Sequence, residues 1–193
     1  MIAENLSSAL LVRVPAAEAA VDAHRARLDL SAKDGVPAHL TVLYPFLPPA
    51  EIGPGVVAAL ADLFACVPRF SFSLDRVRWF GEAVVWLGPS DDAPFRALTA
   101  LTAAAYPSCP PYGGRYLEPQ PHLTIGHDAP AAELRAAAAA VAPLLPIAAA
   151  VTEVTLMAGP DPGQPSGPLS GPRAQWATIA SFPLGPPAAD PPR

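Results

Sequence analysis

Lysine is nearly absent from this sequence, since Lys33 stands alone beside eleven arginines in 193 residues. Charged residues make up only 15% of the chain, and the formal net charge is −5. Proteins that follow long nucleic acids neutralise many phosphates and therefore carry a basic face. This chain lacks the cations for a large basic face, so we expect any nucleic acid to be met at an end, a junction or a short fragment.

Cysteine and long apolar runs are scarce as well. Cys66 and Cys109 are too few for a disulfide framework in a chain of this length, and no metal-ligand spacing surrounds them. The long uncharged stretch at residues 136–152 is mostly alanine and contains two prolines, which excludes a membrane span there. The N-terminus lacks the pattern of a signal peptide. We expect a cytoplasmic monomer without a metal or other cofactor.

The apolar pattern predicts a folded α+β chain, because hydrophobic residues make up 51% and strand and helix periods alternate. The expected strands cover residues 8–14, 39–44, 69–79, 83–87, 122–126, 147–157 and 175–182. The expected helices cover residues 16–29, 55–66, 93–106 and 130–142. Residues 1–184 are expected to form one domain. The chain from Pro183 on is expected to be loose, with a Pro-rich tail at 185–193.

One tetrad occurs twice in the sequence. Residues 39–42 are His-Leu-Thr-Val and residues 122–125 are His-Leu-Thr-Ile, each on an expected strand and shortly after a proline. Residues two apart in a strand share a face. The histidine and threonine of each copy therefore project together, while the two aliphatic residues point into the core.

Two such copies facing each other across a cleft form an acid–base pair. One imidazole takes a proton from water or a hydroxyl nucleophile, and the other gives a proton to the leaving oxygen. The two threonine hydroxyls bind non-bridging phosphate oxygens as negative charge accumulates. The alternative is that both copies are structural strands whose histidines have satisfied hydrogen bonds.

The paired tetrads resemble the signature of the 2H phosphoesterase superfamily, in particular its 2′-5′ RNA ligase-like branch. The Pro45-Phe46 step after the first tetrad and a late strand from Trp176 to Phe182-Pro183-Leu184 are also similar. The resemblance implies a bilobal α+β fold, in which two pseudo-symmetric lobes of antiparallel or mixed sheet, with outer helices, surround a central cleft.

The same resemblance implies an activity. It is metal-independent hydrolysis of 2′,3′-cyclic phosphates, or reversible ligation at 2′-5′ linkages. The catalytic residues would be His39 and His122, and the phosphate-binding residues Thr41 and Thr124. The resemblance leaves open which histidine is the acid and which phosphate isomer is released.

Further candidates lie close to the tetrads. Phe46 either stacks on a base or packs in the core. Tyr112, Arg115 and Tyr116 either contact the substrate or belong to a solvated loop. Arg76 and Arg78 either reach the cleft rim or form surface ion pairs. The three tryptophans, Trp79, Trp86 and Trp176, are expected in the core.

Three classes of function compete. The first is an enzyme acting on a small cyclic phosphodiester, a nucleotide or an RNA terminus. The second is a binding module that recognises a nucleotide or a 2′-phosphate without turnover. The third is a structural or partner-binding protein. Two complete tetrads favour the enzyme, because a binding module would be free to lose a histidine.

Overall fold

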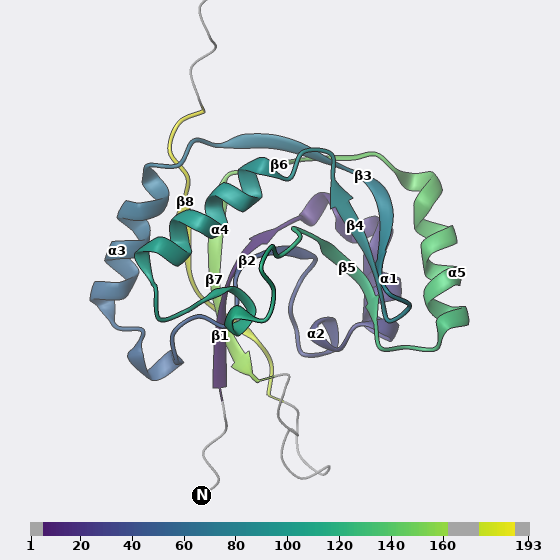
Figure 1. The fold of residues 1–193 in the computed structure, drawn as a ribbon, viewed down its shortest axis with the longest axis horizontal. Coiled ribbons are helices and arrows are strands. Elements are labelled where there is room, and N and C mark those ends of the chain that lie inside the picture. The colour runs from purple at the N-terminus through teal and green to yellow at the C-terminus, as the bar shows by residue number, and fades with distance from the viewer. Residues whose placement is uncertain (1–5, 162–173, 188–193) are drawn as a thin grey trace, which may run out of the picture.

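Two antiparallel four-stranded sheets form the frame of the protein in a computed structural model, which describes residues 6–161 and 174–187 (Figure 1). The first sheet has the order β2-β1-β7-β8 and the second the order β5-β4-β3-β6. The first sheet contains β1 (Leu6–Arg13), β2 (His39–Leu43), β7 (Glu153–Pro160) and β8 (Ala177–Pro183). The second contains β3 (Phe70–Phe80), β4 (Val84–Pro89), β5 (Leu123–His127) and β6 (Ile147–Val151). The predicted bilobal α+β fold is confirmed.

The helices tie the two sheets together, because α1 and α4 cross from one lobe to the other. The helices are α1 (Pro15–Leu28), α2 (Leu30–Lys33), α3 (Pro54–Ala65), α4 (Ala93–Ala105) and α5 (Ala131–Val141), with short 3-10 turns at Pro49–Glu51, Pro111–Gly114 and Ala142–Leu144. Helix α1 follows β1 but packs on β5, and α4 follows β4 but packs on β2 (Figure 1). Within the described ranges, none of these helices has the length and apolar character needed to cross a bilayer.

One main hydrophobic core spans both lobes. It joins residues of the first sheet, such as Val12 and Leu40, to residues of the second, such as Val85 and Leu123, all at most 1% exposed. The helix starts fit their sequences, since a proline stands at N1 or N2 of α1, α3 and α4. The two lobes are therefore held by a common core and not by a surface contact.

Residues 147–157 are two strands in different sheets, so the expectation of one strand is wrong. Strand β6 pairs with β3, whereas β7 pairs with β1 and β8. Thr152 lies between them, and its carbonyl accepts a hydrogen bond from the Leu184 amide at 2.8 Å. The run of alanine and valine contains no glycine or proline at the break, so the local pattern held no signal there.

Residues 183–185 are not loose, which corrects the expectation from the sequence for this part of the chain. Pro183 ends β8, Leu184 is 2% exposed, and the Gly185 amide donates to the Val67 carbonyl at 2.8 Å. Glycine is required at position 185, because a Cβ there would overlap the Ala65 carbonyl oxygen. Residues 188–193 of the expected tail lie outside the described residues.

Candidate active site

The two tetrads lie on the edge strands β2 and β5, where the two sheets meet (Figure 1). Cα atoms of these two strands approach within 8 Å of each other. The predicted alternation is present, because the aliphatic residues Leu40, Val42, Leu123 and Ile125 are buried, whereas His39, Thr41, His122 and Thr124 are half-buried. The fold thus brings together two side-chain pairs that are far apart in the sequence.

The two histidines have the same local geometry. Nδ1 of His39 lies 2.8 Å from the Pro37 carbonyl oxygen, and Nδ1 of His122 lies 2.7 Å from the Gln120 carbonyl oxygen. A carbonyl oxygen can only accept, so Nδ1 carries the proton in both rings. Nε2 of each neutral imidazole therefore keeps its lone pair for a proton-transfer reaction.

Both imidazoles are neutral near pH 7 in this structure. Burial lowers the pKa of His39 to about 4, and the charge of Arg25 and the proximity of His122 act in the same direction. Burial also lowers the pKa of His122. An anion between the rings would favour an imidazolium and raise these pKa values. The site therefore suits a ligand that brings its own negative charge.

Acid should destabilise the protein through His39. Its pKa is about 4 in the fold against 6.5 for an unperturbed histidine, so the unfolded chain binds the proton first as the pH falls. This contribution to the free energy of unfolding is fully present above pH 6.5. It decreases by roughly 2–3 kcal/mol as the pH falls to about 4. Urea unfolding at pH 7 and pH 4.5 should show a smaller acid-induced loss in His39→Gln than in the parent. An equal loss in both proteins would contradict the assignment.

A pocket of about 140 Å³ opens beside the first tetrad. It is lined by Ala9, Leu11, Ser31, Asp34, Val36, His39, Thr41, Tyr44 and Trp176. The rings of Tyr44 and Trp176 lie 6.4 Å apart at this wall. Burial raises the pKa of Tyr112, and a side-chain hydrogen bond with Thr41 opposes that shift, so the Tyr112 side chain reaches the first tetrad.

An aromatic platform lies beside the second tetrad, and we define it as Phe80, Trp86 and Arg78. Phe80 stacks on Trp86 with ring centroids 4.7 Å apart, and its ring meets His122 edge-on at 5.1 Å. The Arg78 guanidinium lies 5.8 Å from the Trp86 ring centroid. Trp86 pairs with Thr124 in the β4–β5 register, so both residues face the same side.

This platform was not predicted from the sequence, because unbroken alternation was assumed along β3. The pairing of β3 with β4 shifts between Leu74 and Arg76, and this irregularity reverses the faces of the following residues. Phe80 was not singled out, and only a core role was expected for Trp86. An aromatic residue next to a β-hairpin turn was the one available signal.

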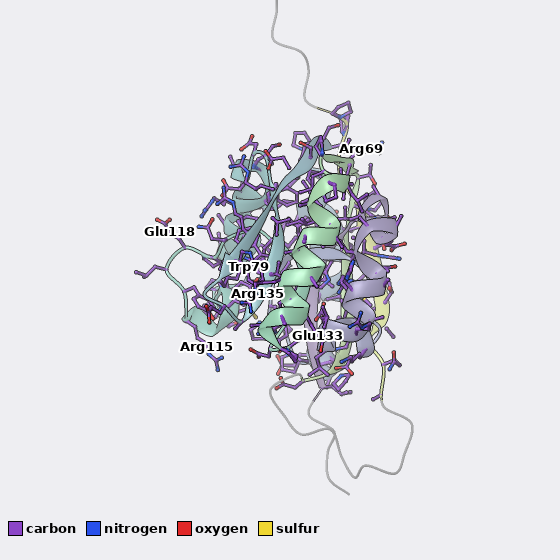
Figure 2. The ribbon with its side chains drawn as sticks, turned by 90° about the vertical axis from the view of Figure 1, so that its right-hand side faces the viewer. Arg69, Trp79, Arg115, Glu118, Glu133 and Arg135 are labelled. Atoms are coloured by element: carbon purple, nitrogen blue, oxygen red, sulfur yellow. The ribbon has the colours of Figure 1, made fainter. Side chains whose placement is uncertain are left out.

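Other predicted contacts lie elsewhere. Phe46 is 5% exposed and packs edge-on against Tyr106 at 4.9 Å, so it takes the core alternative. Arg76 forms a surface ion pair with Asp75 at 2.7 Å. Arg115 is exposed in the loop before β5, and Figure 2 shows it pointing away from the body of the protein.

Two aromatic residues are more exposed than a core position allows. Tyr116 is 61% exposed and packs against Tyr112, with ring centroids 5.7 Å apart. Trp79 is 36% exposed, so the expected core role is wrong for this tryptophan. Among residues 6–161 and 174–187, no cluster of three or more His, Cys, Asp or Glu side chains is placed to hold a metal ion.

Solved structures share this fold. The crystal structure of E. coli LigT complexed with 3′-AMP matches with a TM-score of 0.56 and 23% identity, covering 92% of this chain and 97% of that chain. TT0787 of Thermus thermophilus matches with a TM-score of 0.59 and 18% identity, covering 93% and 98%. E. coli LigT complexed with NADP+ matches with a TM-score of 0.55 and 22% identity, covering 95% and 99%. The protein therefore has a LigT-like α+β fold.

Sequence comparison identifies the family. The model of the 2′-5′ RNA ligase superfamily matches residues 13–161, which is well over half of the chain and contains both tetrads. The chain belongs to the 2′-5′ RNA ligase superfamily. None of the curated proteins compared with it matches.

Proposed function

We propose that this protein is a metal-independent phosphoesterase that hydrolyses 2′,3′-cyclic phosphate ends of RNA or nucleotides, alongside reversible 2′-5′ ligation. One observation carries the proposal. Two neutral imidazoles, each with Nδ1 bound to a carbonyl two residues earlier, lie at the edge strands β2 and β5, and His122 is close enough to lower the pKa of His39. Membership of the superfamily supports the same class of chemistry.

The proposed reaction needs two proton transfers. A water oxygen attacks phosphorus while Nε2 of one histidine takes the water proton. The other histidine takes up a proton at Nε2 when the anionic substrate binds, because the negative charge favours the imidazolium. As the bond from phosphorus to the 2′ or 3′ oxygen breaks, this Nε2–H protonates the departing oxygen. The hydroxyls of Thr41 and Thr124 donate to the non-bridging oxygens, where charge accumulates. Ligation is the same sequence with a ribose 5′-hydroxyl in place of water as the nucleophile, and its reverse cleaves the 2′-5′ linkage to give the cyclic phosphate and the free hydroxyl.

The proposed substrate is small or is bound at an end. The net charge of −5 and the single lysine give little electrostatic attraction for a long polyanion. The platform and the pocket lie next to opposite tetrads, so groups on either side of one phosphate have separate surfaces to contact. A nucleotide, a cyclic phosphodiester or an RNA terminus fits this arrangement.

The test is a turnover assay with chelator present. The substrates are an oligonucleotide ending in a 2′,3′-cyclic phosphate, 2′,3′-cyclic mononucleotides and a 2′-5′ dinucleotide. Conversion to a phosphomonoester supports the proposal, and the product isomer is read by chromatography. Binding without turnover would favour the alternative, a nucleotide or 2′-phosphate binding module. Loss of turnover on adding chelator would contradict the metal-independent mechanism.

Phe80 should contribute to substrate binding by stacking on a base. Its ring is 36% exposed and lies against the His122 imidazole. Base–aromatic stacking contributes about 1–3 kcal/mol, so Phe80→Leu should weaken nucleotide binding by roughly 5- to 160-fold. Isothermal titration with 2′-AMP or 3′-AMP measures the effect, and Phe80→Tyr should retain most of the affinity.

Trp79→Leu is the matched control for this substitution. Trp79 is also 36% exposed and precedes Phe80 in β3, but adjacent residues of a strand point to opposite faces. Trp79 lies on the flank that faces the viewer in Figure 2. Its substitution should leave nucleotide affinity within about twofold. Equal losses in the two variants would show that stability, and not stacking, is responsible.

A further inference from the structure

A buried ion pair lies where α1 ends and α2 begins. Arg25 and Asp29 are 2% and 4% exposed. Nε and Nη2 of Arg25 both donate to Oδ2 of Asp29, at 3.1 and 2.9 Å. Desolvation offsets much of the attraction in such pairs, so the pair is weak evidence of a stabilising role. Its surroundings instead relate it to both histidines, through the segment that precedes His39 and through the charge effects on the two rings.

The pair fixes the segment that holds His39. Nη2 of Arg25 also donates to the Val36 carbonyl at 3.2 Å. The carbonyl of the following residue, Pro37, accepts from Nδ1 of His39 at 2.8 Å. The Arg25 guanidinium therefore holds the Val36 carbonyl in place. The next carbonyl, that of Pro37, orients the His39 imidazole. The cation opposite His39 in the β1–β2 register, Arg13, is exposed.

The same helix is packed tightly against the strand that follows His122. A Cβ on Gly126 would lie 2.9 Å from Cβ of Leu28 and 2.7 Å from Cδ2 of Leu134. Only glycine allows α1 and α5 to approach β5 this closely. Helix α1 is thus hydrogen-bonded to the segment that precedes His39, through the Val36 carbonyl, and is packed against the strand that follows His122.

We propose that the Arg25–Asp29 ion pair positions His39 against His122 and makes the two imidazoles unequal, with His39 as the base and His122 as the acid. This inference rests on the proposed function. The Arg25 cation is bound to the segment leading into His39 and favours the neutral ring, which accepts a proton. The Asp29 anion favours the protonated ring.

The electrostatic causes agree with this assignment. After burial, Arg25 is the largest cause lowering the pKa of His39, and Asp29 raises that pKa by a smaller effect. Asp29 also raises the pKa of His122, on which Arg25 has no comparable effect. His122 also lowers the pKa of His39, and His127 lowers that of His122. Two further titratable residues, Asp34 and Tyr44, line the same pocket as His39.

The test removes both charges at once, in Arg25→Met with Asp29→Asn. The introduced asparagine keeps the side-chain oxygen that accepts from the Ser31 amide at the start of α2, and no unpaired charge stays buried. The fold should therefore survive, with Tm within a few degrees of the parent. Turnover should fall about 10- to 100-fold with KM within about threefold, because the imidazole is displaced and not the substrate.

The pH dependence of kcat/KM should change in a defined direction. His39 loses the larger influence of Arg25, so its pKa rises and the acidic limb moves to higher pH. His122 loses only the influence of Asp29, so its pKa falls and the alkaline limb moves to lower pH. The bell-shaped profile should narrow from both sides. A merely structural role would lower turnover without moving either limb.

Two further variants separate charge from geometry. Arg25→Lys keeps the positive charge but cannot donate two hydrogen bonds from a planar group to Asp29. Turnover should therefore fall, while both limbs of the pH profile of kcat/KM stay at the same pH. The control is Arg27→Met with Glu133→Gln, which removes an exposed ion pair of 2.9 Å between the same helix and α5. This control should leave turnover, pH limbs and Tm unchanged.

Imidazole NMR separates this inference from the proposed function. If the parent turns over none of the substrates, the proposed function fails, but the His39 and His122 resonances still report tautomer and titration. In Arg25→Met with Asp29→Asn, the two titrations should move toward each other, and His39 should lose its single Nδ1–H tautomer. Unchanged titrations and tautomers in this variant would overturn the inference.

Discussion

His39→Ala and His122→Ala should each lower kcat by about 10²- to 10⁴-fold on a 2′,3′-cyclic phosphate substrate, because each removes one of the two proton transfers. Nucleotide affinity should change by less than about threefold, since the threonines and aromatic surfaces remain. The double variant should be little worse than either single one, because the two residues act as a unit. Single-turnover kinetics and product titration measure the two effects separately.

The control for both substitutions is His127→Ala. His127 lies at the end of β5, and its side chain is 52% exposed beside Asp128. Its removal should leave kcat within about twofold. Full turnover in His39→Ala or in His122→Ala would exclude the paired acid–base mechanism. A loss of folding in either variant would be seen by circular dichroism, and asparagine at the same position then replaces alanine.

Thr41→Val and Thr124→Val should each lower kcat by about 10²- to 10³-fold. Valine keeps the shape of the side chain but removes the hydroxyl that donates to the phosphate in the transition state. KM should change less than kcat, because the charge on the non-bridging oxygens grows during the reaction. Serine at either position should restore most of the rate, since it restores the donor.

Thr178→Val is the matched control for the threonine substitutions. Thr178 is exposed on β8, in the same sheet as Thr41 but away from the tetrads. It should leave kcat unchanged. Equal rates in Thr41→Ser and Thr41→Val would show that the hydroxyl does not bind the phosphate. Tyr112→Phe would then show whether the Thr41–Tyr112 contact is instead structural.

The sequence predicted the local structure of the chain, namely the buried face of each tetrad and the starts of most helices. The period-two pattern of each tetrad fixed which residues are buried, and Leu40 and Leu123 are 0% exposed as expected. Prolines and glycines marked most helix starts. These features depend on a few neighbouring residues, so short stretches of sequence contain the necessary information. The repeat of the tetrad also indicated the family, because the same unusual residue combination occurs on two strands.

The assembly of the site was decided only by the tertiary structure. Arg25 reads as one more polar residue on a helix, but α1 crosses to the other lobe and buries it against Asp29. Phe80 reaches the second tetrad because an irregularity in β3 changes the face that it occupies, and there it stacks on Trp86 of β4. Arg25 and Asp29 are only four residues apart, but their burial depends on long-range packing. The contacts of Phe80 and Trp86 with His122 join residues tens of positions apart and depend on strand register. The sequence by itself determined which side of each tetrad is buried and indicated the candidate reacting groups, whereas the packing of the two lobes decided what surrounds them.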